Sequence, residues 1–128
     1  MSVLGPLIRS FEASAAVEGY RFAAGANDGA KVRRAASATD RIAGVTERMG
    51  AGAAGDMLDV VLAGPTEVLA GGTFAAFDPL TSDATGRAIR AVPVAGQVVR
   101  VGGYALADAV AGDIVQVNVA PSIINTPA

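Results

Sequence analysis

The hydrophobic residues of this chain recur in short stretches separated by turns that are rich in glycine, proline, asparagine and aspartate. Several of these stretches alternate apolar and polar residues, which predicts β-strands rather than helices. The predicted strands cover residues 8–12, 20–24, 31–35, 41–46, 56–63, 66–69, 73–77, 88–92, 98–106 and 114–119. The pattern therefore predicts an all-β fold, a small β-barrel or sandwich of short strands.

Glycine and proline set the expected strand boundaries. Gly64-Pro65 is expected to break one strand, and Pro121 is expected to end the last one. Gly102-Gly103 lies inside a predicted strand, where adjacent glycines indicate a bend or bulge. The alanine-rich residues 12–18 have the best helical propensity of the chain, so a single helical turn is considered there.

One segment occurs nearly twice. Ala-Gly-Asp followed by an apolar strand occurs at residues 54–61 and again at residues 111–119. Aligning Asp56 with Asp113 gives an offset of 113 − 56 = 57. Further matching pairs are Gly29 with Gly86, Tyr20 with Phe77 and, with a slip of two residues, Gly44 with Gly103. The repeat predicts a fold built from two related halves.

The predicted organisation has three parts. Residues 1–19 are expected to form an extended N-terminal arm that includes the first strand. Residues 20–121 are expected to form a single β-domain with pseudo-repeats at about 20–62 and 77–119, and residues 122–128 a short tail. The total of 128 residues fits one domain.

Repeated aspartate and glycine residues are expected to shape the turns. An aspartate at a loop-to-strand junction can accept backbone N–H bonds, and glycine tolerates a positive φ. The pattern therefore favours a capping role over a catalytic one for these aspartates. The residues assigned to structural turns are Asp28, Gly29, Gly55, Asp56, Gly86, Gly112 and Asp113.

Apolar residues near both ends of the chain are predicted to make contacts with other molecules. An apolar arm is expected to dock either on its own core or on a neighbour, and a frayed terminus is the alternative. The candidate interface residues are Val3, Leu4, Leu7, Ile8, Phe11, Ile123 and Ile124.

Composition narrows the classes of partner. Charged residues make up 17% of the chain, below the usual value of about 25% for soluble domains. Two explanations for the low fraction of charged residues stay open. Part of the protein surface is buried in an assembly, or the composition is simply rich in alanine.

The net charge is −2 without a basic cluster, so no nucleic-acid partner is expected. No stretch approaches a membrane span of about 20 apolar residues, and no signal peptide is recognised, so a soluble protein made in the cytosol is expected.

The residue types leave little room for catalysis. The chain has no histidine and no cysteine, which excludes the Ser-His-Asp and Cys-His nucleophile systems and ordinary zinc sites. Asp56 and Asp59 are three apart, so a strand would place them on opposite faces. Residues 78–83 lack the oxygen spacing of a calcium loop, and no phosphate-binding glycine motif is present. No catalytic, cofactor or metal site is predicted, so the protein is not expected to be an enzyme.

Taken in order, the segments resemble the capsid cement, or head decoration, proteins of tailed phages. The resemblance covers most of the chain and depends on the order and spacing of several turn and strand segments. These are residues 20–22, 42–46, 53–64, 78–88 and 103–117. The family has no catalytic residues, so the resemblance implies none here.

The resemblance implies a structural role on a virion. The protein would bind the outer surface of a phage head and stabilise contacts between subunits of the major capsid protein. It would also associate with itself, with a homotrimer as the expected state, and it would need no cofactor. A phage tail or baseplate adaptor, or another oligomeric β-module, is the alternative that the sequence leaves open.

Lys31 suggests a more distant alternative, because the two-fold β pattern is also similar to biotinyl and lipoyl carrier domains. Those domains carry a lysine at the tip of a tight turn. Lys31 follows the turn at residues 25–29 and is expected inside the next strand. A solvated strand lysine is therefore the preferred interpretation.

Overall fold

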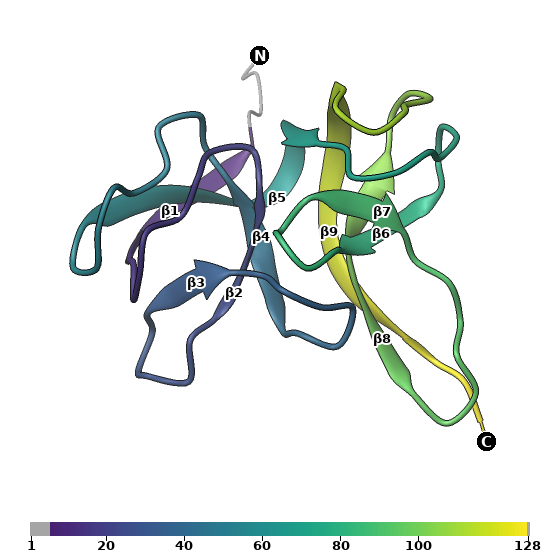
Figure 1. Cartoon of the computed structure of the whole chain (residues 1–128), viewed down its shortest axis with the longest axis horizontal. Helices are drawn as coiled ribbons and strands as arrows, with labels where there is room; N and C mark the ends of the chain where they lie inside the picture. Colours follow the sequence, from purple (N-terminus) through teal and green to yellow (C-terminus); the bar gives the residue numbers. More distant parts are fainter. Residues whose placement is uncertain (1–5, 128) are drawn as a thin grey trace, which may run out of the picture.

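The structure is a computed structural model that describes residues 6–127, and these residues form nine strands and no helix (Figure 1). The all-β prediction is confirmed. The strands are β1 (Leu7–Glu12), β2 (Phe22–Gly25), β3 (Val32–Arg34), β4 (Ile42–Thr46), β5 (Met57–Leu69), β6 (Pro79–Ser82), β7 (Ala88–Arg90), β8 (Val98–Ala105) and β9 (Ile114–Asn125).

The strands form one curled antiparallel sheet. Its order is β3-β2-β4-β5-β9-β8-β6-β7, and β1 pairs with β5 outside this path. Figure 1 shows β1 to β4 on one side of the molecule and β6 to β8 on the other, with β5 and β9 between them. Isolated bridges from Ala13 to Val32 and from Ala70 to Ala88 curl each side toward closure. Each side is therefore a small, partly closed barrel.

The strand β5 joins the two sides. Its first part pairs with β1 and β4, and residues 64–69 pair with β9. The prediction that Gly64-Pro65 breaks this strand is wrong, since residues 66–69 continue it. Gly64 has a φ of 98°, which lets the strand bend as it changes partner. Pro65 is tolerated because alternate residues of an antiparallel strand turn their N–H away from the partner.

The strand β9 is also longer than predicted. Pro121 does not end it, and the strand continues to Asn125. The extension exists because the start of β8 provides a partner, with Val98 opposite Asn125 and Val101 opposite Ser122. The register shift between Val101 and Gly103 confirms the predicted bulge in β8.

Two further predictions about local structure are wrong. Residues 73–77 form no strand, and only Phe74 makes an isolated bridge, to Ala109. Residues 12–18 form no helical turn. The N–H of Ala13 donates to the Asp56 carbonyl and that of Val17 to the Ala51 carbonyl, both at 2.9 Å. These long-range bonds replace the local ones that a helix would need.

Equivalent hydrogen bonds recur in the two halves. Ala53 N donates to Asp56 Oδ2 and Val110 N donates to Asp113 Oδ2, both at 3.1 Å. The carbonyls of the same two aspartates accept from Ala13 N and from Ala70 N, at 2.9 and 2.7 Å. Ala13 and Ala70 differ by the same offset of 57, so the matching contacts begin before the predicted repeat boundaries at residues 20 and 77.

The turn glycines show the same equivalence. Gly55 and Gly112 have φ values of 91° and 95°, and Gly29 and Gly86 have values of 59° and 79°. These are left-handed conformations that glycine adopts without a steric cost. A sequence repeat with an offset of 57 thus corresponds to a repeat of backbone geometry.

The largest cluster of buried side chains contains residues from both halves. Phe22 of β2, Leu80 of β6 and Val117 of β9 are fully buried members of it. The other members are Ala24, Ala35, Ile42, Val45, Val61, Val68, Ala70, Phe74, Ala88, Ala105, Ala109, Val115 and Val119. The halves therefore share one core instead of forming two separate domains.

Candidate docking surface

The predicted interface residues lie in different places. Leu7 and Ile8 on β1 are exposed, and Ile123 on β9 is exposed. Phe11 and Ile124 are only half-exposed, because each packs against a smaller buried cluster. Residues 7–12 of the predicted arm form β1 and pair with β5. Val3 and Leu4 lie outside the described residues.

Leu7 and Ile8 are not brought together with Ile123. The first two pair with β5 in the N-terminal half, and Ile123 pairs with Arg100 of β8 in the C-terminal half. The structure therefore separates the predicted apolar contacts into two distinct surfaces.

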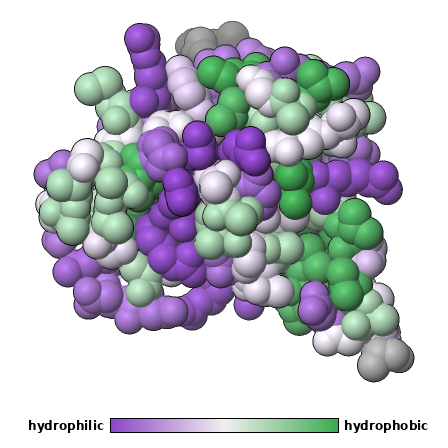
Figure 2. Space-filling view, in the orientation of Figure 1, coloured by the Kyte–Doolittle hydropathy of each residue, from purple (hydrophilic) through white to green (hydrophobic). Residues whose placement is uncertain are grey.

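Exposed apolar side chains are distributed unevenly between the halves. Of the thirteen large hydrophobic residues exposed among residues 6–127, four precede residue 70 and nine follow it. The nine are Phe77, Val92, Val94, Val98, Tyr104, Leu106, Val110, Ile114 and Ile123. Figure 2 shows the most hydrophobic surface at the top and at the lower right, toward the β8 and β9 side. The C-terminal half is therefore the better candidate for docking.

Ion pairs are concentrated in the other half. Five of the six ion pairs among the described residues join side chains between residues 12 and 40. Repeated backbone geometry thus carries two surfaces of opposite character, one ionic and one apolar.

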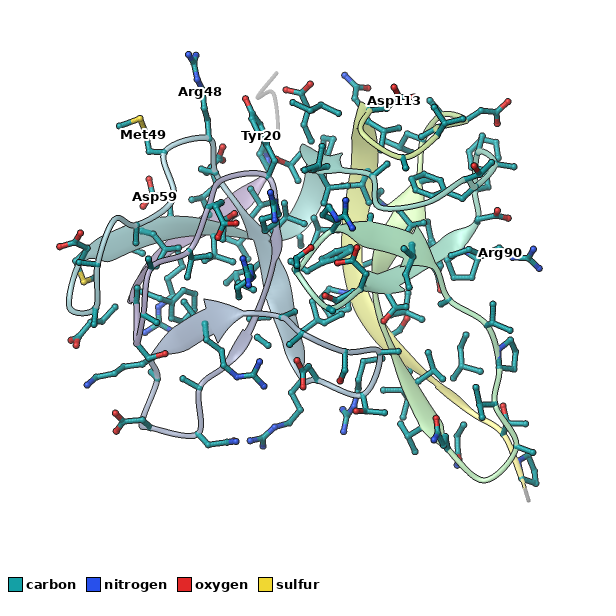
Figure 3. The ribbon with its side chains drawn as sticks, viewed as in Figure 1. Tyr20, Arg48, Met49, Asp59, Arg90 and Asp113 are labelled. Carbon is teal, nitrogen blue, oxygen red and sulfur yellow. The ribbon has the colours of Figure 1, made fainter. Side chains whose placement is uncertain are left out.

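Four of the exposed apolar residues form what we call the loop patch: Phe77, Leu106, Val110 and Ile114. Phe77, Leu106 and Val110 lie in segments that connect strands near the Ala105 end of β8, and Ile114 is the first residue of β9. A shallow pocket of about 570 Å³ lies in these segments, lined by Phe74, Val110 and the carboxylates of Asp78, Asp108 and Asp113 among others. Arg90 also lines it and extends outward from the molecule (Figure 3).

The aspartates beside the loop patch hold its backbone in place. Asp78 Oδ2 accepts from Ala75 N at 2.9 Å, and Asp108 Oδ1 accepts from Ala76 N at 2.8 Å. Among residues 6–127, no group of acidic side chains is arranged to hold a metal ion. The carboxylates of Asp78 and Asp108 therefore have a structural role, because each accepts a backbone N–H bond of the neighbouring loop.

Phe77 is the most unusual residue of the loop patch. Its side chain is 76% exposed, and its φ is 70°, a left-handed value that bulky residues seldom adopt. The bond from Phe77 N to the Ala105 carbonyl, at 2.7 Å, helps to hold this conformation. Tyr20, its repeat partner, has a φ of 59°. The alignment of Tyr20 with Phe77 was visible in the sequence, but exposure of the Phe77 ring was not.

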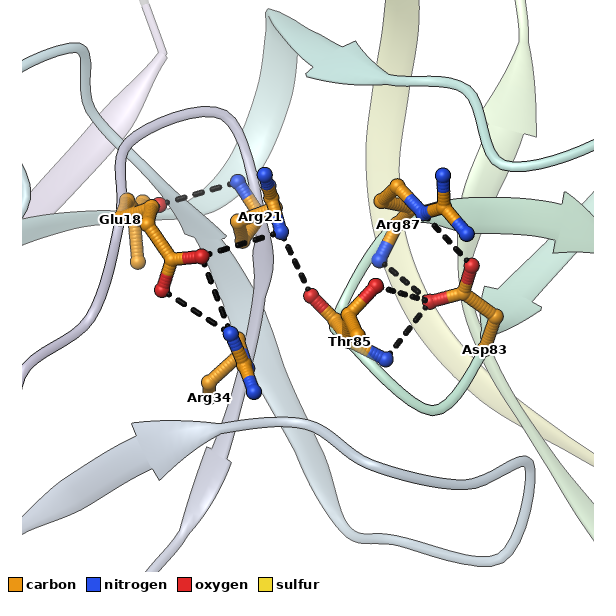
Figure 4. Close-up of polar contacts among 7 residues, drawn as sticks. Glu18, Arg21, Arg34, Asp83, Thr85 and Arg87 are labelled. Carbon is orange, nitrogen blue, oxygen red and sulfur yellow. Dashed lines mark hydrogen bonds and ion pairs between the residues drawn. The ribbon is translucent and has the colours of Figure 1, made fainter. Parts of the chain in front are cut away.

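A polar network links the two halves (Figure 4). Arg21 lies 3.3 Å from Glu18 and donates to the Thr85 carbonyl at 2.8 Å. Asp83 then accepts bonds of 2.9 Å from Thr85 N, Arg87 N and Arg87 Nε. Burial would raise the pKa of Asp83, but these bonds and the Arg87 charge outweigh it and lower that pKa below its usual value.

Lys31 is held as a charged group. Its Nζ lies 3.3 Å from Asp28 Oδ2 and 3.4 Å from Glu12 Oε2. The bonds to Asp28 and Glu12 raise the pKa of Lys31. Lys31 precedes β3 and does not lie within it, which corrects the sequence prediction. In the described part of the chain, no helix is long and apolar enough to cross a bilayer.

Comparison with known proteins gives a match in fold. No protein-family model matches the chain, and no curated protein matches it in sequence. The chain is similar to the crystal structure of the head fiber gp8.5 N base of bacteriophage phi29, with a TM-score of 0.62 and 22% identity. The match covers 89% of this chain and 93% of the other. The resemblance to phage head decoration proteins that the sequence indicated is therefore confirmed at the level of the fold.

Proposed function

We propose that this protein is a non-enzymatic cement protein that binds the outer surface of a phage head, made in the host cytoplasm and acting in the virion. The fold match to a phage head fiber base is the observation that carries the proposal. The uneven distribution of exposed apolar residues supports it, because a docking protein needs one apolar face and one solvated face.

The loop patch is the proposed contact with the major capsid protein. Phe77 is an exposed aromatic ring, and aromatic anchors supply much of the energy of protein interfaces. Val110 lines the pocket beside the loop patch, and Ile114, which follows the pocket residue Asp113 in the chain, adds further exposed apolar area. The ion pairs of Lys31 with Asp28 and Glu12, in the other half, then face solvent.

The mechanical role follows from many weak bridges acting together. A rigid β-domain that touches two neighbouring capsid subunits raises the cost of separating them when packed DNA presses outward. Each bridge gains from effective concentration once one contact is made, so each contact can be modest. Self-association, with a homotrimer as the proposed state, would multiply the bridges further.

The experiment is co-sedimentation of the purified full-length protein with expanded, undecorated phage heads. We expect the wild type to pellet with heads, and Phe77→Asn and Ile114→Asn to weaken binding by about tenfold or more, since each removes an apolar anchor. Met49→Asn is the matched control, because Met49 is 89% exposed and lies outside the loop patch.

Two results would contradict the proposal. If the protein binds phage tails and not heads, the tail or baseplate adaptor is the better interpretation. If intact-mass measurement shows a biotinyl or lipoyl adduct on Lys31, the carrier alternative is correct. If Phe77→Asn, Ile114→Asn and Met49→Asn all bind heads equally well, the protein binds heads through a surface other than the loop patch.

A further inference from the structure

We propose that the protein contacts a second capsid subunit through the far end of β8 and β9, by means of an apolar patch flanked by arginines. The patch, which we call the ribbon patch, consists of the exposed side chains of Val94, Val98 and Ile123. The inference rests on the proposed cement function and deepens it, because bridging two neighbouring subunits requires a contact in addition to the loop patch.

The ends of β8 and β9 that carry the patch extend beyond the rest of the sheet. β5 pairs with β9 only as far as Val119, and β6 pairs with β8 only at Gly103 and Tyr104. Among the strands of the described chain, residues 98–101 and 122–125 pair only with each other. Figure 1 shows these two strand ends projecting together at the lower right. A two-stranded ribbon is marginally stable alone, so it depends on what packs against its faces.

One face of this ribbon is covered by the protein itself. Side chains alternate between the two faces of a strand, so Val99, Val101 and Ile124 share one face. These three pack in a cluster with Ala38 and Ala91. The cluster accounts for the stability of the ribbon and leaves its opposite face without a cover in the described chain.

The opposite face is apolar. Val98 and Ile123 lie on it, and both are exposed. Val94 precedes β8 and is also exposed, and its carbonyl accepts from Gln97 N at 3.0 Å, next to Val98. Figure 2 shows hydrophobic surface at the lower right, where the ribbon projects. Burial of these side chains against a partner removes apolar area from water, which favours a contact.

The charges nearest to the patch are positive. Arg100 is paired with Ile123 across the ribbon, and Arg100 and Arg41 line a shallow pocket of about 220 Å³ beside Ile123. Neither arginine belongs to an ion pair among residues 6–127. The sequence has no acidic side chain in residues 84–107 or in residues 114–128.

Two acids lie on loops beside the ribbon or its arginines, and each already has a partner. Asp40 Oδ2 is 3.0 Å from Arg33 Nη1, and Asp28 Oδ2 is 3.3 Å from Lys31 Nζ. The ribbon patch therefore complements a surface that is apolar and carries carboxylates.

Charge also selects between a capsid subunit and a second copy of this chain. Two copies that met through the ribbon patch would bring Arg41 and Arg100 of each copy together, and like charges oppose such a contact. The carboxylates of Asp78 and Asp108 lie beside the loop patch, which the head occupies in the proposed function. A carboxylate-bearing, apolar surface of a capsid subunit is therefore the occupant that we assign.

The two patches lie far enough apart to reach two subunits. Ile114 of the loop patch and Ile123 of the ribbon patch are 123 − 114 = 9 residues apart on the same strand. Nine residues of a strand span about 30 Å. β9 thus forms a continuous link between a contact at one end of the molecule and a contact at the other.

Co-sedimentation of full-length variants with expanded, undecorated heads tests the contact. Ile123→Asn should weaken binding by about tenfold, because it removes an apolar contact. Arg100→Glu should weaken binding strongly at low salt and less at high salt, because ions screen the charge. The controls Met49→Asn and Arg48→Glu, at exposed positions outside both patches, should bind like the wild type. Thermal unfolding checks that each variant folds, and Val98→Asn replaces Ile123→Asn if that variant does not.

Bridging gives a second readout that simple attachment would not. At concentrations that saturate the heads, the wild type should raise the temperature at which the heads break open, measured by light scattering. Ile123→Asn should coat the heads at saturation without raising that temperature, because a bridge needs both contacts.

The inference is overturned if Ile123→Asn and Arg100→Glu bind like their controls, or if heads coated with Ile123→Asn are as stable as heads coated with the wild type. It is also overturned if these variants lower the mass of the free protein in analytical ultracentrifugation and leave head binding intact, since the patch would then hold a second copy. Head binding survives in each of these outcomes, so the cement function stands. Absence of head binding by the wild type would instead reject the cement function, and this contact with it.

Discussion

At the scale of single residues, the most informative position is Phe77. Its backbone is held in a left-handed conformation and its ring is exposed, so neither the backbone nor the side chain is optimised for stability. Retention of a strained apolar residue at the surface is typical of positions that serve binding. Tyr20 shares the backbone conformation but is only half-exposed, which makes Phe77 the distinctive member of the pair.

Replacing Phe77 by asparagine should stabilise the fold. Asparagine adopts a positive φ more readily than phenylalanine, and relief of the strain is worth about 1 kcal/mol in the free energy of unfolding. Urea denaturation of the free protein would measure this gain in the free energy of unfolding. Phe77→Ala removes the same ring without the backbone preference and should give no such gain. An equal gain for both variants would show that the ring, and not the backbone, is the source of the effect.

Asp83 should make stability depend on acid pH. Its pKa is lowered in the folded protein, so its contribution is fully present above the unfolded pKa of about 3.9 and is lost as the pH falls through the folded pKa. Asp83→Asn should lower the free energy of unfolding at pH 7 by about 1.5–3 kcal/mol, because charged hydrogen bonds to Thr85 and Arg87 are weakened.

The measurement is urea denaturation at several pH values between 7 and about 2.5. The difference between wild type and Asp83→Asn should shrink as the pH falls below about 4. The control is Glu67→Gln, at an exposed position on β5. A constant difference across this range would mean that the Asp83 charge does not stabilise the loop.

At the scale of strands, Gly44 and Gly103 show how the repeat is built. A Cβ on Gly44 would overlap the Val61 carbonyl oxygen, and a Cβ on Gly103 would overlap that of Asn118. Val61 and Asn118 differ by the same 57 residues as the two repeats. Both glycines therefore allow the same close approach between neighbouring strands, β4 to β5 and β8 to β9.

Alanine at either glycine should destabilise the protein to a similar extent. Gly44→Ala and Gly103→Ala are each expected to lower the free energy of unfolding by about 1–3 kcal/mol, because the strands must separate to admit a methyl group. Gly25→Ala is the control, since nothing lies within 4 Å of a Cβ at that site, and its effect should stay within about 0.5 kcal/mol. Strongly unequal effects would contradict an equivalent role in the two halves.

At the scale of the whole molecule, the two halves should unfold together. The ring of Phe22 from β2 lies against Gly102 of β8, where a Cβ would overlap ring atom Cε1, so one half reaches into the other. The shared cluster of buried residues and the shared strands β5 and β9 leave no boundary at which the molecule could separate. Small single domains with one core usually unfold in one cooperative step.

Phe22→Ala tests this cooperativity. The variant should lose about 3–5 kcal/mol of stability, since Phe22 is fully buried and its removal leaves a cavity. Native-state hydrogen exchange should show reduced protection of the amides of β8 and β9 as well as those of β2 and β4. Unchanged protection in β8 and β9 would mean that the halves are separate folding units.

The sequence by itself determined the fold class, the internal repeat and most strand positions. These properties depend on local alternation of apolar residues and on turn chemistry, both of which can be recognised within a few neighbouring residues. The bulge at Gly102-Gly103 is predictable for the same reason. The order of the turn and strand segments also indicated the resemblance to phage head decoration proteins.

Only the tertiary structure decided where strands continue and which apolar residues stay exposed. Pro65 and Pro121 lie inside strands because their partners, β9 and β8, come from distant parts of the chain and no local pattern records them. Phe11 is partly buried while Phe77 is exposed, although both are phenylalanines near strand ends. Exposure depends on what packs against a side chain. Phe11 packs against a cluster that includes Val17, Val32 and Leu58, which only the tertiary fold brings together.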